Sequence, residues 1–416
     1  MTKKQFCLLS AALIAFLAIS LPAFAGQEMT MDGYIQKTVE VSPAAAAAMA
    51  EIQGMEATAI ETGQRTNPTL QTDVTAVRNN SGREVEVEFE QPLRGSDFGV
   101  RKNYAAAIRA AKNGEQKARL LDLSHDAARA YTDLWLAQEK ISLLDRLADN
   151  AQRQIKTVKE AVSQGMADTG DAKILVTEVS ELHLQKHKLT AEHRILLNTF
   201  ARLAGIPVEN YVLTAPPVRQ LPDNKDALQA MSANEASIRS LLTNRRAMAE
   251  RRLATAEADG ALPEITPRAV ARRDFTGDSS SILLGVRVQL PLWSRNQAEA
   301  LRAQAEYTST DRSLKALDEN NFSVVLENAW QSAQDDQNIA EQYRVSVVPG
   351  WREVEKLTEK KLGLGQASIF DLWQARTKVL ESETKSLEAR QGAVEAVLTL
   401  ENLTGAPFAV ISGKGK

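Results

Sequence analysis

The sequence predicts a mainly α-helical protein that is internally duplicated, with long coiled-coil hairpins and four β-strands. Three observations lead to this prediction. Apolar residues follow a heptad pattern over long stretches, short motifs return at an offset of about 200 residues, and an alternating strand pair precedes each heptad region.

The clearest heptad pattern runs from Ala127 to Val162, where two interleaved lines of positions are all apolar and the residues between them are mostly charged or polar. A period of 3.5 residues predicts a helix that supercoils around a partner. The partner follows directly, with a leucine at every seventh position from Leu175 to Leu203. A first helix from about Gly95 to Gln164 would be roughly 100 Å long, so we expect a long hairpin that reverses at Gly165.

The second half of the chain repeats this organisation. The motif Leu203-Ala-Gly-Ile-Pro207 returns as Leu403-Thr-Gly-Ala-Pro407. The second seam, from Leu326 to Leu357, is less regular, and Pro349 falls inside its helix, where we expect a bend or a local break. Further matched positions are Gly165 with Gly365, Asp171 with Asp371, and Tyr131 with Trp330.

Each hairpin is preceded by a strand pair with one apolar and one polar face. The first pair is Leu70–Ala76 with Glu84–Glu90, joined by a turn at Arg78–Gly82, and the second is Ile265–Ala271 with Leu284–Leu290. Two interpretations of the polar face are open, namely an acidic lumen that favours cations, or cross-strand ion pairs. The polar-face positions are Glu84, Glu86, Glu88, Glu90, Arg268, Arg272 and Arg287.

The strand pairs point to a membrane. Strands of about ten residues with one apolar face have the length of transmembrane barrel strands. Four strands cannot close a barrel, and open sheet edges are not tolerated in lipid. We therefore expect several copies to combine, and a trimer would form a barrel of about twelve strands continued by an α-helical barrel.

The N-terminus has the features of a secretory signal peptide. Lys3 and Lys4 precede an apolar run, Cys7–Leu21, and Ala23-Phe24-Ala25 is a cleavage motif that predicts a mature start at Gly26. Its removal takes away the chain's only cysteine and changes the formal net charge from −3 to −5. The chain has no basic block, and aromatic residues make up 5% of it, so we expect no nucleic-acid partner.

These features divide the chain into six expected segments. They are the signal peptide 1–25, an N-terminal helical segment 26–66, a first repeat 67–215, connector helices 216–262, a second repeat 263–408 and a tail 409–416.

The order of these segments resembles the TolC family of trimeric outer-membrane channels. The resemblance covers residues 67–407 and rests on Asn67-Pro-Thr-Leu70, Gln91-Pro92-Leu93 and a Gly-x-x-Ser-x-x-Asp motif after each seam. The motif is complete at Gly365–Asp371, and its first copy has Asp168 in place of the serine. The stretch Leu290–Gln297 is similar to the CzcC-like branch, which serves cobalt, zinc and cadmium efflux.

The resemblance implies a homotrimer in the Gram-negative outer membrane that extends into the periplasm. Its implied partners are a periplasmic adaptor protein, an inner-membrane RND-type pump and outer-membrane lipid, and no cofactor is implied. Asp371 and Asp171 would line the periplasmic entrance. The adaptor would dock at the hairpin tips, at Gly165, Gly365 and Ser368.

Other functions have less support from the residues. No nucleophile–base pair, paired carboxylates or phosphate loop is recognisable, so we expect no enzyme. His183 and His187 have the spacing of a two-ligand metal site, but they fall on the outer face of the heptad frame, where we expect solvated side chains. Two alternatives to an efflux channel remain, a secreted or periplasmic coiled-coil scaffold and a type I protein-secretion channel.

Overall fold

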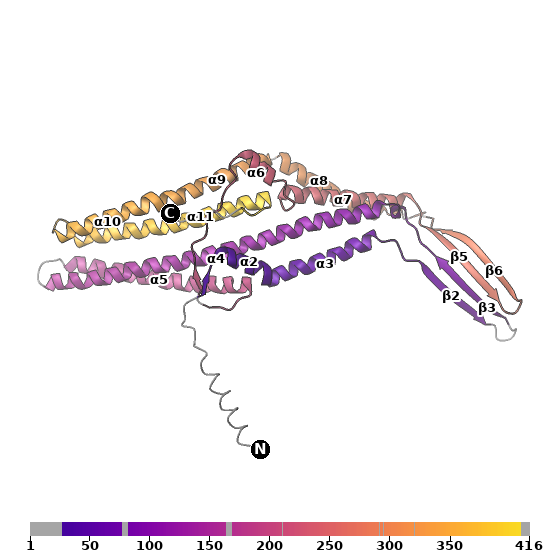
Figure 1. Cartoon of the computed structure of the whole chain (residues 1–416), viewed down its shortest axis with the longest axis horizontal. Helices are drawn as coiled ribbons and strands as arrows, with labels where there is room; N and C mark the ends of the chain where they lie inside the picture. Colours follow the sequence, from indigo (N-terminus) through magenta and orange to yellow (C-terminus); the bar gives the residue numbers. More distant parts are fainter. Residues whose placement is uncertain are drawn as a thin grey trace, which may run out of the picture.

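The computed structural model is an elongated molecule with helices along most of its length and a β-sheet at one end (Figure 1). The residues that it describes are 27–76, 82–163, 169–209, 211–290, 292–293, 295–319 and 321–408. The predicted signal peptide, most of the predicted turn at 78–82, Gly165 and the tail 409–416 lie outside the described residues.

The first hairpin consists of α4 (Val100–Ser163) and α5 (Thr169–Ala204), which lie side by side (Figure 1). At 64 residues, α4 is one unbroken helix and spans roughly 95 Å. Every seam position from Ala127 to Val162 is buried or half-buried, as are the five heptad leucines of α5. The predicted coiled-coil hairpin is confirmed.

The second hairpin has more interruptions. It comprises α8 (Gln297–Glu319), α9 (Phe322–Gln342), a π-helical turn η2 (Tyr343–Val347), α10 (Val348–Gly363) and α11 (Ile369–Thr404). The π turn lies directly before Pro349, whose missing N–H cannot bond the carbonyl of Val345 as an α-helix requires. The expected irregularity at Pro349 is therefore confirmed, and it takes the form of a widened turn.

The four predicted strands form one antiparallel sheet. The strands are β2 (Thr69–Ala76), β3 (Arg83–Glu90), β5 (Ile265–Asp274) and β6 (Ser279–Val288), in the order β2-β3-β5-β6. The two halves of the chain meet between β3 and β5, where Val87 is opposite Ala271. Leu290, which we expected at the end of the fourth strand, lies just beyond it.

The remaining helices brace the hairpins. Helix α3 (Pro43–Gly63) packs against α4 and leads to β2, while α7 (Ile238–Ala261) packs against α8 and α4 and leads to β5 (Figure 1). Helix α7 thus has the position in the second half that α3 has in the first. The joining segment between the halves also contains α6 (Lys225–Met231).

An aromatic core lies at the middle of the molecule. It contains α2 (Met31–Val41) and a parallel pair of short strands, β1 (Gln27–Met29) and β4 (Tyr211–Leu213). The rings of Tyr34 and Phe200 stack with centroids 3.9 Å apart. This core fastens the N-terminal segment to the base of the first hairpin.

Both copies of the repeated Leu-x-Gly-x-Pro motif end a returning helix. Gly205 and Gly405 have φ angles of 63° and 70°, a conformation that glycine adopts without a Cβ penalty. A Cβ at Gly405 would also lie 2.1 Å from the backbone nitrogen of Ser237. The repeat is therefore a helix stop used twice.

Candidate functional site

The sheet has one apolar face to which all four strands contribute. The register places Val87 of β3 between Thr72 of β2 and Ala271 of β5, and it places Phe89 opposite Leu70. No other part of the described chain covers these side chains, and Ile282 and Leu284 are each 79% exposed. An apolar surface that extends over a whole sheet indicates a membrane or a protein interface. Its largest exposed members are Leu70, Val74, Phe89, Ile282, Leu284 and Val286.

The opposite face of the sheet carries ion pairs. Every predicted glutamate of β3 has an arginine partner, which confirms the cross-strand pairing interpretation. Asp73 of β2 and Asp274 of β5 share this face by register, so it retains more acids than arginines. The nitrogen–oxygen distances are 2.5 Å for Arg272–Glu84, 2.8 Å for Arg272–Glu86, 3.2 Å for Arg268–Glu88 and 2.7 Å for Arg287–Glu90.

Exposed aromatic residues lie at both ends of the sheet. Phe275, at the hairpin end between β5 and β6, is 59% exposed, while Phe98 and Trp293, near the helical end, are 70% and 88% exposed. The strands between them have eight to ten residues, a length of roughly 26–33 Å. That spacing matches the thickness of the apolar part of a bilayer.

The tip of the second hairpin is built from the sequence motif. Gly365 has φ +70°, its N–H donates to Leu362 O at 3.0 Å, and the next N–H, from Gln366, donates to Lys361 O at 2.8 Å. These two bonds end α10 in a Schellman motif. The turn therefore depends on glycine at position 365.

Helix α11 then begins with a capping box. The Ser368 hydroxyl accepts from the Asp371 N–H at 3.1 Å, and the Asp371 carboxylate accepts from the Ser368 N–H at 2.8 Å. The Ser368 hydroxyl also donates to this carboxylate at 2.8 Å. The backbone hydrogen bond, and after it the hydroxyl one, hold the pKa of the exposed Asp371 carboxyl below its usual value. Asp371 thus has a local structural role. In the first hairpin Gly165 lies outside the described residues, and Asp171 lies in the first turn of α5.

The described residues contain neither a cluster of metal ligands nor a membrane-spanning helix. His183 and His187 are both exposed on α5, as expected. No group of three or more metal-ligating side chains occurs among the described residues. None of the helices in the described part of the chain is long and apolar enough to cross a membrane.

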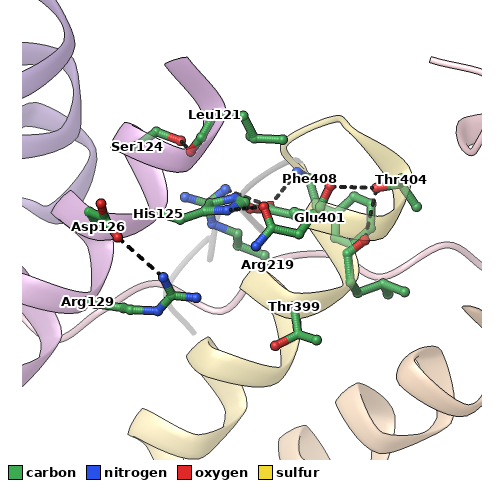
Figure 2. Close-up of polar contacts among 12 residues, drawn as sticks. Leu121, Ser124, His125, Asp126, Arg129, Arg219, Thr399, Glu401, Thr404 and Phe408 are labelled. Carbon is green, nitrogen blue, oxygen red and sulfur yellow. Dashed lines mark hydrogen bonds and ion pairs between the residues drawn. The ribbon is translucent and has the colours of Figure 1, made fainter. Parts of the chain in front are cut away.

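Sequence reasoning missed a buried polar cluster at the base of the second hairpin (Figure 2). The carboxylate of Glu401, which is fully buried, is 2.9 Å from His125 Nε2 and accepts from Arg219 Nη1 at 2.8 Å and from the Phe408 N–H at 2.6 Å. It connects α4, the joining segment and the end of α11. One feature of the sequence could have indicated this cluster. Glu401 is a charged residue at the position where the first copy of the repeat has Ala201.

Comparisons with known proteins agree with this architecture. No protein-family model matches the chain. The cobalt-zinc-cadmium resistance protein CzcC of Cupriavidus metallidurans is 22% identical in an alignment of 377 residues that covers 86% of this chain and 86% of that one. The crystal structure of the outer membrane protein VceC of Vibrio cholerae has a TM-score of 0.71, covering 91% of this chain and 96% of that one at 16% identity.

The chain has the TolC-family fold. The same TolC-type architecture is found in the Campylobacter jejuni CmeC outer membrane channel, with a TM-score of 0.72 at 10% identity over 91% of this chain and 86% of that one. The predicted fold class, a duplicated and mainly helical protomer with two long hairpins and four strands, is confirmed.

Proposed function

We propose that this protein is the outer-membrane channel component of a tripartite efflux system in a Gram-negative cell. It spans the outer membrane with its strands, extends into the periplasm with its hairpins, and passively conducts substrate to the exterior without a chemical step. An inner-membrane RND-type pump and a periplasmic adaptor deliver the substrate. The observation that carries the proposal is a four-stranded sheet with one uncovered apolar face.

Three copies satisfy the requirements of the sheet. In the described residues β2 and β6 are the outer strands, so their outward N–H and C=O groups need partners in lipid. Pairing β2 of one protomer with β6 of the next would close a barrel of about twelve strands, within the range that outer-membrane barrels use. The apolar faces would then face lipid, and Glu84, Glu86, Glu88, Glu90, Arg268, Arg272 and Arg287 would face the lumen.

We propose heavy-metal cations as the substrate class. The named relative CzcC is a cobalt-zinc-cadmium resistance protein, and the polar face of the sheet has more acids than arginines. Deleting the gene should lower the zinc, cobalt and cadmium concentrations that the cells tolerate. Unchanged metal tolerance together with loss of an exported protein would favour the type I secretion alternative.

The assembly is tested on the mature protein extracted from outer membranes. It should migrate as a trimer, and Val87→Arg should prevent insertion because a charge near the bilayer centre costs about 2–4 kcal/mol per copy. Glu86→Gln, on the other face of the same strand, is the control and should insert normally. A soluble periplasmic monomer would instead support the scaffold alternative.

We further propose that the hairpin tips are the periplasmic entrance and the adaptor-docking site. Asp371 and Asp171 would then form a ring of six acids in a trimer, and Gly165, Gly365 and Ser368 would lie at the docking points. Gly365→Val should abolish metal resistance without affecting trimer formation, because a β-branched residue disfavours a φ of +70°.

The acid ring is tested by single-channel recording. Asp371→Asn keeps a side-chain oxygen for the cap but removes the charge, so it should raise conductance or weaken block by multivalent cations. If both measurements matched those of the wild type, Asp371 would serve the cap alone.

A further inference from the structure

A cavity of 690 Å³ lies where the two hairpins meet the segment that joins the halves of the chain. Trp135 of α4 and Met31 contribute to its wall, Pro216–Arg219 line it from the joining segment, and α9, η2 and α11 supply the rest. Its volume is in the range of small-molecule sites. It is remote from the sheet and from the hairpin tips, so the proposed channel function does not account for it.

Much of the cavity wall is apolar and pre-formed. Trp135, Val397 and Met31 are at most 3% exposed, and Pro216 and Pro217 restrict the backbone of the segment that lines it. An apolar wall of this extent offers dispersion contacts to an apolar molecule of matching size. The wall therefore favours an occupant with an apolar body.

Arginine side chains contribute to the polar part of the wall. The guanidinium of Arg390 on α11 lies 5.9 Å from the Trp135 ring centroid, and its Nε and Nη2 donate to Pro216 O at 2.9 and 2.5 Å. Among the described residues no carboxylate forms an ion pair with Arg390. Burial, and to a lesser degree the neighbouring charge of Arg344, lower the pKa of this guanidinium, while the charge of Glu341 partly opposes the shift.

Glu341 offsets the charge of Arg390 only in part. Glu341, the one acid that lines the cavity, is engaged by Arg344 at 2.8 and 2.5 Å. Arg219 also lines the cavity and is paired with Glu401 (Figure 2). The side chains that line the cavity therefore include more cations than acids.

We propose that this cavity binds a small anionic amphiphile, a molecule with one carboxylate, sulfonate or phosphate head group on an apolar body. The head group would compensate the charge of Arg390, and the apolar body would pack against Trp135 and Val394. The combination is selective, because an apolar alcohol leaves the cations uncompensated and a free anion leaves the apolar wall empty. This inference is independent of the proposed channel function.

Trp135 makes the proposal testable by fluorescence. The probe is 12-bromododecanoate, whose bromine quenches nearby tryptophan, added to the full mature protein in a non-ionic detergent. 12-Bromododecanol is the matched uncharged probe. We expect saturable quenching by the carboxylate at a concentration at least ten times lower than by the alcohol, and Trp135→Phe should remove the saturable component.

Two cavity variants and one control complete the experiment. Arg390→Gln should weaken carboxylate binding at least tenfold, and Ala393→Phe, which fills the cavity from α11, should abolish binding without removing charge. Arg129→Gln, on the surface of α4 outside the cavity, should bind as the wild type does. Equal quenching by acid and alcohol, unchanged binding in both cavity variants, or displacement of the probe by millimolar inorganic phosphate would overturn the proposal.

Discussion

The two hairpins come from one duplicated plan but differ in continuity. In the first, α4 runs for 64 residues without interruption. In the second, the corresponding outgoing path is divided by Asn321, which has φ 51°, and by the π turn before Pro349. The seams differ in the same way, since Val158 of α4 is fully buried while Val354 of α10 is 42% exposed.

This difference affects how the two hairpins can bend. A continuous helix with a closed seam resists bending, while a π turn and a helix break allow a change of direction at a defined position. The exposed apolar residues of the second hairpin include Val345, Val354 and Leu357, which a neighbouring protomer could cover. The outgoing path is therefore continuous in the first hairpin and interrupted at two defined positions in the second.

The largest expected effect concerns the ends of the two returning helices, where Glu401 replaces Ala201. Glu401→Ala would leave His125 and Arg219 buried without their carboxylate, so we expect a loss of about 3–5 kcal/mol of unfolding free energy. Denaturant unfolding followed by circular dichroism measures it. The control is Glu395→Ala, a surface partner of Arg129, which should cost less than about 1 kcal/mol. Equal losses would show that the buried cluster has no special structural role.

The next effect compares the two seams directly. Val158→Ala removes two methyl groups from a fully buried site, and we expect a loss of about 2–3 kcal/mol. Val354→Ala, at the partly exposed site, should cost less than about 1 kcal/mol in the separated protomer. A loss at Val354 as large as that at Val158 would contradict the seam difference seen within the chain.

The sequence predicted the parts of this fold that depend on periodicity. The heptad of α4 and the alternation of Glu84–Glu90 each indicate one buried or paired face, so the hairpin and the two strand pairs followed from the pattern alone. The ion pairs were one of two interpretations that the pattern left open. The roles of Glu401 and Arg390 were not predicted, because each depends on a tertiary contact with the joining segment, whose sequence has no periodic pattern. The unit boundaries at 67, 216 and 263 remain a prediction, although the matching positions of α3 and α7 support a division into two similar halves.

A smaller effect concerns two aromatic side chains at matching positions of the repeats. The Tyr131 hydroxyl lies 2.7 Å from Met29 O and 2.8 Å from Thr214 O, while Trp330 Nε1 donates to Pro222 O at 3.0 Å. Tyr131→Phe should cost about 1–2 kcal/mol, because it removes the hydroxyl donor from this buried site and leaves Met29 O with the longer bond from the Thr214 N–H, at 3.3 Å. Trp330→Phe, at a half-buried site, should lower the unfolding free energy by less than Tyr131→Phe does. A larger loss for Trp330→Phe would show that the second half of the chain is the more tightly anchored.

The smallest expected effect lies at the hairpin tip and depends on pH. Ser368→Ala removes the N-cap of α11 and should lower the unfolding free energy by about 0.5–2 kcal/mol.

The reciprocal bond uses the Asp371 carboxylate, whose pKa is lowered by its hydrogen bonds to Ser368. A carboxyl with a folded pKa below its unfolded value of about 3.9 stabilises the fold above that pH, and the stabilisation is lost as pH falls through the folded pKa. The difference in thermal midpoint between wild type and Asp371→Asn should therefore be present at neutral pH and shrink below about pH 4. In the first hairpin the serine position is occupied by Asp168, so Asp168→Asn offers the matched comparison. A difference at Asp371 that persisted unchanged into strong acid would mean that the charge does not contribute to the cap.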